Sequence, residues 1–229
     1  MILPQIPAEW KPLPRTFYEA SARAVAPRLL GHWLVRNSPH GPYGGPIVEV
    51  EAYLEGDPAS HGYGGERVRN RLMYGPPGRV YVYLIYGFHN CVNAVCRPAG
   101  CPEAVLIRAI EAEAGLEWMR QNRATRTDFS LTNGPGKLCQ ALDIQRKLNG
   151  LDLCDASGPL YIARNPAVTR FRKQRGPVGI SKRIGITKAA GMPLRFYLMG
   201  SPFISRRERP AGGSSSGEYA RSSPMRPER

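Results

Sequence analysis

The 229 residues suit a single hydrophobic core, and their 42% apolar and 22% charged content is typical of a globular domain with short tails. The 25 glycines and 22 prolines exclude a simple helical bundle, no apolar run approaches the roughly 18 residues that cross a bilayer, and five cysteines without paired spacing argue against a disulfide-stapled secreted domain. The formal net charge of +14 indicates an anionic partner, and we expect a soluble, intracellular protein.

The first third of the chain predicts an arm, a helix and a hairpin. Residues 1–17 form the expected arm, because four prolines within the first 16 residues favour an extended backbone. An Ala-rich segment predicts a helix over 18–30, and Pro27 predicts either a kink or a restart near Ala26. Two strand-like runs, 32–36 and 47–54, flank a segment rich in Pro and Gly, which predicts a hairpin with its turn over 39–46.

The remaining elements favour an α+β class, with a single domain over 18–205. After a polar, Gly-rich loop, three strand-like runs separated by short turns predict an antiparallel meander. We expect strands over 80–86, 91–96, 104–110, 160–163, 184–187 and 194–198, and helices over 111–123 and 136–142. Residues 206–229 consist mainly of Arg, Gly, Ser and Pro, so we expect a disordered basic tail.

The positive charge is concentrated in the second half of the chain. Residues 1–114 carry 11 basic and 10 acidic side chains, whereas residues 115–229 carry 21 and 8. No acidic residue occurs between Asp155 and Glu208. A field of one sign suits a polyanion, so nucleic acid is the leading partner. A solvated basic face is the simpler alternative, and the lack of a basic amphipathic helix disfavours an anionic membrane surface.

Two carboxylates lie on one face of the strand predicted over 47–54. The period of two places Glu49, Glu51 and Tyr53 opposite the apolar side chains. Such a face is ordinarily open to water, and both carboxylates are then simply solvated. A carboxylate held beside an aromatic ring in a partly dry pocket could instead activate water for attack on a glycosidic carbon.

Tyrosines are concentrated in the strand predicted over 80–86. Tyr81 and Tyr83 share a face, whereas Tyr86 has the opposite parity and precedes the turn at Gly87. A half-buried strand favours Tyr and Val in any case. The functional alternative is a stacking platform for a nucleobase, with a ring at the strand end that fills a gap in a base stack.

Neither the cysteines nor the histidines have the spacing of metal ligands. Cys91, Cys96 and Cys101 recur every five residues, which on strands places neighbours on opposite sides, and no CxxC pair exists. The four histidines are scattered. We therefore expect buried thiols and no metal site.

Several motifs occur together in one order. They are Glu49-Val50-Glu51-Ala52-Tyr53, Ser60-His61, Arg69-Asn70-Arg71, Tyr81-Val82-Tyr83-Leu84-Ile85-Tyr86-Gly87, Asn93, Leu106-Ile107-Arg108-Ala109, Gly134-Pro135-Gly136-Lys137-Leu138-Cys139-Gln140-Ala141-Leu142, Arg183-Ile184-Gly185-Ile186 and Pro193-Leu194-Arg195-Phe196-Tyr197. With these motifs the chain closely resembles the alkyladenine (3-methyladenine) DNA glycosylase family, over roughly 18–205. The resemblance implies a single mixed domain with a curved antiparallel β-sheet and peripheral helices.

The resemblance also implies an activity and a partner. Members flip a damaged purine out of double-stranded DNA and hydrolyse its N-glycosidic bond, which leaves an abasic site in base excision repair. We therefore expect a monomeric, monofunctional enzyme that needs no metal or organic cofactor and does not act at a membrane. A noncatalytic nucleic-acid-binding module is the alternative. Within the family, the preferred lesion among alkylated, deaminated and etheno purines stays open.

Site residues follow from the same resemblance. Glu51 is the expected general base, and Arg108 and backbone groups around Ile184 are expected to hold the attacking water. The pocket for the base is expected to comprise Tyr53, His61, Tyr83 and Asn93. Tyr86 is the expected DNA wedge, and the residues expected near it are Met73, Phe88 and His89.

Overall fold

The computed structural model describes residues 10–205 of the chain. The strands are β1 (Trp33–Ser38), β2 (Gly41–Tyr53), β3 (Val80–Ile85), β4 (His89–Cys96), β5 (Glu103–Ile110), β6 (Leu160–Ala163), β7 (Val178–Ser181) and β8 (Arg195–Leu198). The α-helices are α1 (Ala22–Leu29), α2 (Leu116–Asn122), α3 (Phe129–Thr132), α4 (Pro135–Ala141) and α5 (Val168–Gln174). Short 3₁₀ helices cover Arg15–Phe17, Arg71–Tyr74 and Arg146–Leu148. The first nine residues of the expected arm and the expected tail over 206–229 lie outside the described residues.

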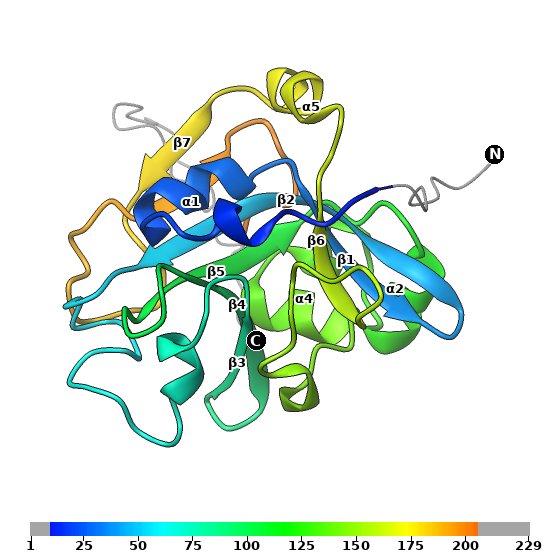
Figure 1. Ribbon diagram of the computed structural model, residues 1–229. Coiled ribbons are helices and arrows are strands. Elements are labelled where there is room, and N and C mark those ends of the chain that lie inside the picture. Colours follow the sequence, from blue (N-terminus) through cyan, green and yellow to red (C-terminus); the bar gives the residue numbers. More distant parts are fainter. Residues whose placement is uncertain (1–9, 206–229) are drawn as a thin grey trace, which may run out of the picture.

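Strand β2 connects the two parts of a curved antiparallel sheet (Figure 1). Its first half pairs with β1, from Gly41 opposite Ser38 to Pro46 opposite Trp33. Its second half pairs with β5 on one edge and with β8 on the other. β3 and β4 extend the sheet beyond β5, and β6 extends it beyond β1. The expected α+β class and the single mixed domain with a curved antiparallel sheet are confirmed.

The turn predicted over 39–46 is wrong, because most of that segment belongs to β2. The chain reverses at Pro39 and His40 alone, and the strand then runs through the Gly- and Pro-rich residues. The reason is close approach: a Cβ on Gly45 would lie 1.6 Å from the carbonyl oxygen of Glu111. Glycine is required here by a neighbouring backbone and not by a turn.

Helix α1 is shorter than predicted and continues through its proline. It begins at Ala22 after Ser21, whose hydroxyl accepts a hydrogen bond from the Ala24 amide at 3.4 Å. Pro27 lies inside the helix, which neither ends before it nor restarts at Ala26. Tyr18 closes the preceding 3₁₀ turn and is fully buried.

Two further predictions differ from the structure, and three of its helices and strands were not predicted. The helix predicted over 111–123 starts only at Leu116, because the Glu111 amide still pairs with the Pro46 carbonyl oxygen of β2. These unpredicted elements are α3, α5 and β7, and α5 buries none of its residues, so no broad apolar face marks it in the sequence. The strand predicted over 184–187 is a loop, and β7 pairs with β8 instead.

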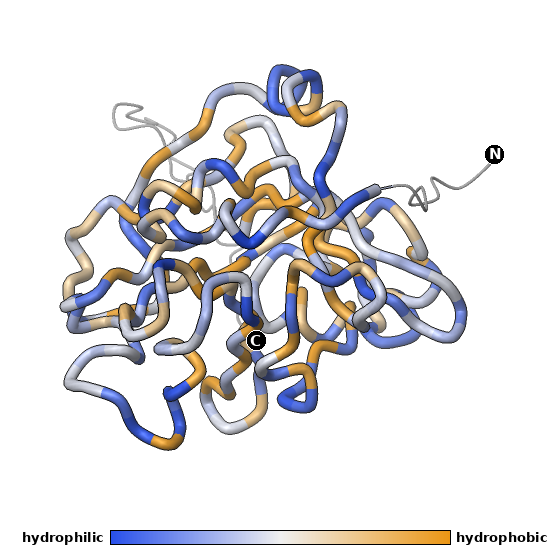
Figure 2. The backbone as a smooth tube through the Cα atoms, in the orientation of Figure 1, coloured by the Kyte–Doolittle hydropathy of each residue, from blue (hydrophilic) through white to orange (hydrophobic). Residues whose placement is uncertain are grey.

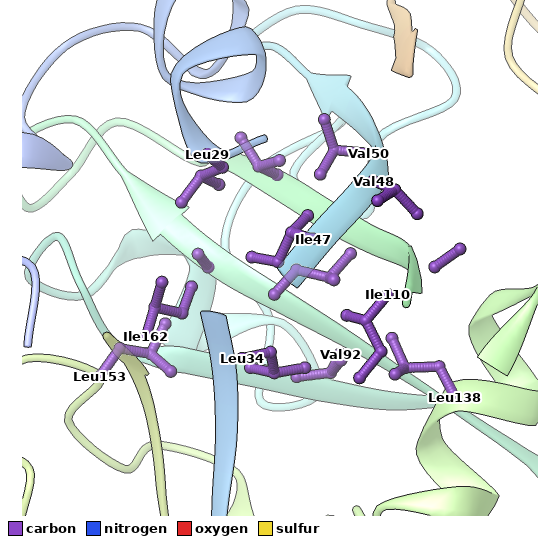
Figure 3. Packing of buried hydrophobic residues seen from close by; sticks show 14 of the residues in the cluster. Leu29, Leu34, Ile47, Val48, Val50, Val92, Ile110, Leu138, Leu153 and Ile162 are labelled. Atoms are coloured by element: carbon purple, nitrogen blue, oxygen red, sulfur yellow. The ribbon is translucent and has the colours of Figure 1, made fainter. Parts of the chain in front are cut away.

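The main core lies between β2, β5 and the helices. Leu29 of α1 and Val48 and Val50 of β2 belong to one cluster of buried side chains, and Ile110 and Leu138 continue this cluster toward α4 (Figure 3). Hydrophobic segments concentrate at the centre of the molecule, and hydrophilic ones lie mainly at its edge (Figure 2). The apolar side chains of β2 thus pack into the core, whereas its acidic side chains do not belong to the core cluster. No helix among residues 10–205 is long and apolar enough to cross a membrane.

Candidate active site

The carboxylate of Glu51 is completely buried and held by two hydrogen-bond donors and one ion pair. Its Oε1 accepts a hydrogen bond from the Ile184 amide at 2.8 Å and faces Nη1 of Arg108 at 3.1 Å. Its Oε2 accepts from the Tyr53 hydroxyl at 3.0 Å. These three partners come from β2, from β5 and from the loop after β7, so the carboxylate is fixed in position while it keeps unused acceptor capacity. The solvated alternative for Glu51 is therefore wrong.

Arg108 of β5 links the two acidic residues of β2. Its Nε donates to Glu49 Oε1 at 2.8 Å, while Nη1 faces Glu51. Burial disfavours the charged guanidinium, but both carboxylates overcome this effect and raise the pKa of Arg108 above its ordinary value. Glu49 is as fully buried as Glu51, so the solvated alternative is wrong for both.

Tyr53 lies beside the carboxylate and remains a hydrogen-bond donor. Burial raises the pKa of its hydroxyl, and the neighbouring charge of Glu51 raises it further. The phenol thus keeps its proton and directs it at Glu51.

A cavity of about 460 Å³ opens beside this group. The lining residues include Tyr53, Arg108 and Ile184, which surround the Glu51 carboxylate. The other residues of the wall come from the loop before β3, from β3–β5, from the start of α4 and from the loop after β7: Ala59, His61, Met73, Tyr81, Tyr83, Leu84, Ile85, Tyr86, His89, Cys91, Asn93, Leu106, Pro135, Gly136, Gly185 and Ile186. The expected pocket residues thus meet in one hollow.

Aromatic rings form one wall of the cavity. The His61 ring lies 4.2 Å from that of Tyr83, centroid to centroid, and the rings of Tyr81 and Tyr83 lie 5.7 Å apart. Nδ1 of His61 is 3.0 Å from the Tyr81 hydroxyl, which orients the imidazole. Burial lowers the pKa of His61, and the charge of Arg69 lowers it further. A neutral imidazole is thereby favoured.

Asn93 is fixed by the neighbouring strand. It is buried, and its Nδ2 donates to the Tyr81 carbonyl oxygen at 3.0 Å. With its amide nitrogen engaged in this way, Asn93 presents a rigid polar group to the cavity that it lines.

The β3–β4 hairpin carries an exposed aromatic tip at the mouth of the cavity. Tyr86 is 73% exposed and has a φ of +54°, which is followed by +79° at Gly87. Positive φ at successive turn residues suits a tight hairpin but strains a tyrosine, because its Cβ crowds the backbone. Phe88 is 70% exposed, and its ring lies 4.3 Å from that of His89.

Met73 does not belong to this tip. It is only 2% exposed and packs with Tyr81, Val95 and Ala104 under the cavity. A side chain so enclosed cannot enter a base stack, so the expected place of Met73 near the wedge is corrected to the pocket wall.

Residues to which the family resemblance assigns no role also belong to the site. Glu49 joins Arg108 to Arg195, and Tyr81 orients His61. Pro135 and Gly136 belong to a motif that the sequence displays, yet only the fold brings them to the cavity. No group of three or more potential His, Cys, Asp or Glu metal ligands occurs within residues 10–205. Cys91 and Cys96 are buried as expected, whereas Cys101 is partly exposed.

Comparison with known proteins places this arrangement in a family. The model of the methylpurine-DNA glycosylase (MPG) family matches residues 16–202. The chain belongs to this family. It is 51% identical over 195 residues to a protein of Methanoculleus marisnigri and 50% identical over 194 residues to one of Rhodopseudomonas palustris. These matches cover 85% of this chain and 99% and 88% of the relatives, both of which are named putative 3-methyladenine DNA glycosylase. The resemblance that the sequence motifs indicate is confirmed.

Proposed function

We propose that this methylpurine-DNA glycosylase family member is a monofunctional DNA repair enzyme that flips alkylated or deaminated purines out of duplex DNA and hydrolyses their N-glycosidic bonds. The observation that carries the proposal is the buried Glu51 carboxylate, which is held by Ile184, Tyr53 and Arg108, three residues that line an aromatic cavity. Family membership supports the glycosylase activity. Duplex DNA is accordingly the partner, and we propose that the enzyme acts as a monomer and away from membranes.

Glu51 would act as the general base. Hydrolysis needs a water molecule that attacks the anomeric carbon as the base departs, through a transition state with positive charge on the sugar. A fixed carboxylate serves both needs, since it accepts the water proton and stabilises the developing charge. Arg108 and the Ile184 amide hold Oε1, and Tyr53 holds Oε2, so the carboxylate is positioned before the substrate arrives.

The aromatic wall would select the base. A purine alkylated on the ring carries positive charge, and the faces of Tyr53 and Tyr83 attract a cation. The lowered pKa of His61 keeps a competing positive charge out of the same wall. Asn93, rigid at the cavity surface, would exclude or accept exocyclic groups. No step in this scheme uses a metal ion or an organic cofactor.

The hairpin tip would hold the DNA open. An exposed ring at a turn can fill the gap that a flipped nucleotide leaves, and damaged bases unstack at lower cost than normal ones. Tyr86 has the required exposure and lines the cavity, Phe88 follows it as a second exposed ring, and His89 also lines the cavity. The basic second half of the chain would add contacts to phosphates.

Single-turnover incubation with labelled duplexes, each bearing one defined lesion, tests the proposal. Alkaline cleavage then reports abasic sites. We expect excision without added divalent metal for 3-methyladenine or 7-methylguanine, and a panel with hypoxanthine and ethenoadenine ranks the lesions. Binding without excision across the panel would support a noncatalytic nucleic-acid-binding module instead. The charge of Glu51 beside the cavity weighs against that alternative, because a binding module needs no carboxylate next to a phosphate-rich ligand, where its charge lowers the affinity.

A further inference from the structure

The second carboxylate of β2 has an environment that the reaction described above does not use. Glu49 is fully buried beside Glu51. Its Oε1 receives Nε of Arg108 at 2.8 Å, Nε of Arg195 at 2.8 Å and the Ser205 hydroxyl at 2.7 Å, and its Oε2 accepts from the Ser205 amide. Burial opposes ionisation, but the two arginines and this amide hold the pKa of Glu49 below its ordinary value.

Arg108 shares its guanidinium among three partners. Nε contacts Glu49, Nη1 contacts Glu51 at 3.1 Å, and Nη2 donates to the Ser205 hydroxyl at 3.1 Å. A planar guanidinium held at Nε and Nη2 has no freedom to rotate, so the position of Nη1 against Glu51 is fixed by Glu49 and Ser205.

We propose that Glu49 is a positioning residue for glycosidic bond hydrolysis, which acts through Arg108 and is completed by Ser205 near the end of the described chain. The inference rests on the proposed function of Glu51 and Arg108. Among the described residues, this cluster comprises two buried carboxylates and two buried arginines of opposite charge. Without Glu49, Arg108 loses its Nε anchor, and Glu51 is then the one carboxylate within residues 10–205 that contacts it.

A double-mutant cycle tests the proposal. Glu49→Gln keeps the side-chain shape but removes the charge, and we expect single-turnover excision to fall by up to about 100-fold while affinity for lesion duplex changes little. In an Arg108→Gln background, Glu49→Gln should not lower the excision rate further, because Glu49 acts through Arg108, which is already replaced. Glu49→Asp should restore part of the rate. A purely structural role would give equal losses in both backgrounds.

A milder variant covers the case in which Glu49→Gln does not fold. Ser205→Ala removes the hydroxyl between Glu49 and Arg108, and we expect a smaller loss of excision rate, again absent in the Arg108→Gln background. Ser157→Ala, which alters an exposed hydroxyl bonded to Asp155, is the matched control and should leave the rate unchanged. If the wild type excises the lesion and both Glu49→Gln and Ser205→Ala keep the full excision rate, the positioning role alone is overturned. A wild-type chain without excision would overturn the proposed function and this inference together.

Discussion

The guanidinium carbon of Arg183 lies 4.6 Å from the centroid of the Tyr53 ring. Hydrogen bonds hold the Arg183 guanidinium in place. Its Nη2 donates to Asp57 Oδ1 at 3.1 Å, and its Nη1 donates to the Ala52 carbonyl oxygen at 3.1 Å. Both members of the Arg183–Asp57 pair are buried. The ring that donates to Glu51 is therefore supported by a buried ion pair that also anchors the loop containing Ile184.

Breaking this pair should destabilise the fold. Asp57→Asn leaves the Arg183 charge buried and without its counter-ion, a change that typically costs about 3 kcal/mol or more of unfolding free energy. Urea unfolding measures it. Asp155→Asn, at an exposed turn, is the control, and equal stabilities for the two variants would contradict the supporting role of the pair.

Replacement of the general base should separate chemistry from binding. In Glu51→Gln we expect single-turnover excision to fall by about 10²- to 10⁴-fold, because the base that activates water is lost. Affinity for the lesion duplex should persist or increase, since a negative charge beside DNA is removed. Fluorescence anisotropy on the same duplex reports the affinity, and full excision by the variant would refute the assignment.

We expect the hairpin tip to contribute to the affinity for duplex DNA and not to the stability of the fold. Tyr86→Ala removes an exposed ring, so we expect a loss of about 1–3 kcal/mol in lesion-duplex binding, the usual magnitude of one stacking contact. Unfolding stability should be nearly unchanged, and Tyr86→Phe should bind like the wild type. A Tyr86→Ala chain with normal duplex affinity would exclude the wedge role. Anisotropy titrations and urea unfolding measure the two effects.

We expect two exposed arginines beside the cavity to contribute to the salt dependence of DNA binding. Arg69 and Arg146 line a smaller hollow that shares His61, Tyr81 and Tyr83 with the main cavity. If each contacts one phosphate, Arg69→Ala and Arg146→Ala each reduce the slope of log affinity against log salt by about 0.9. Arg120→Ala, which removes an exposed partner of Asp128, serves as the control. Slopes equal to the wild type would place both arginines outside the DNA contact.

His32 should make the fold sensitive to acid. Burial lowers its pKa to about 4, and nearby arginines contribute. Above pH 6.5 the imidazole is neutral in both states and has no effect. Below it the unfolded chain takes up a proton that the folded chain does not, so stability falls until pH 4, by about 3 kcal/mol in total.

His32→Gln should remove this component. We expect its stability to decline less than that of the wild type between pH 6.5 and 4, as urea unfolding at several pH values would show. Glu113, whose pKa is raised to about 7 by burial, acts in the opposite direction over much of this range. Glu113 contributes equally to the wild type and to His32→Gln, so the difference between their stability profiles reports the effect of His32 alone. Parallel stability profiles would contradict the buried, neutral state of His32.

Local sequence was sufficient for the elements with a strong pattern. Strand periodicity placed Glu49, Glu51 and Tyr53 on one face of β2, and the Tyr-rich run became β3 with Tyr81 and Tyr83 side by side. The ordered motifs were specific enough to indicate the family. These features depend on neighbouring residues, which the sequence displays directly.

The tertiary structure decided what depends on distant partners. The burial of Glu51 involves partners far away in the sequence, such as Ile184, 133 residues away, whose amide donates to the carboxylate. The Gly-rich start of β2 resembles a turn in the sequence. The glycine at position 45 is required by the backbone that follows β5, and only the folded chain shows that this backbone lies there. The buried charge of Glu49 is likewise stabilised by the distant Arg195 and by hydrogen bonds from Ser205. Burial and charge pairing are properties of the folded chain, since water satisfies the same groups until folding removes it.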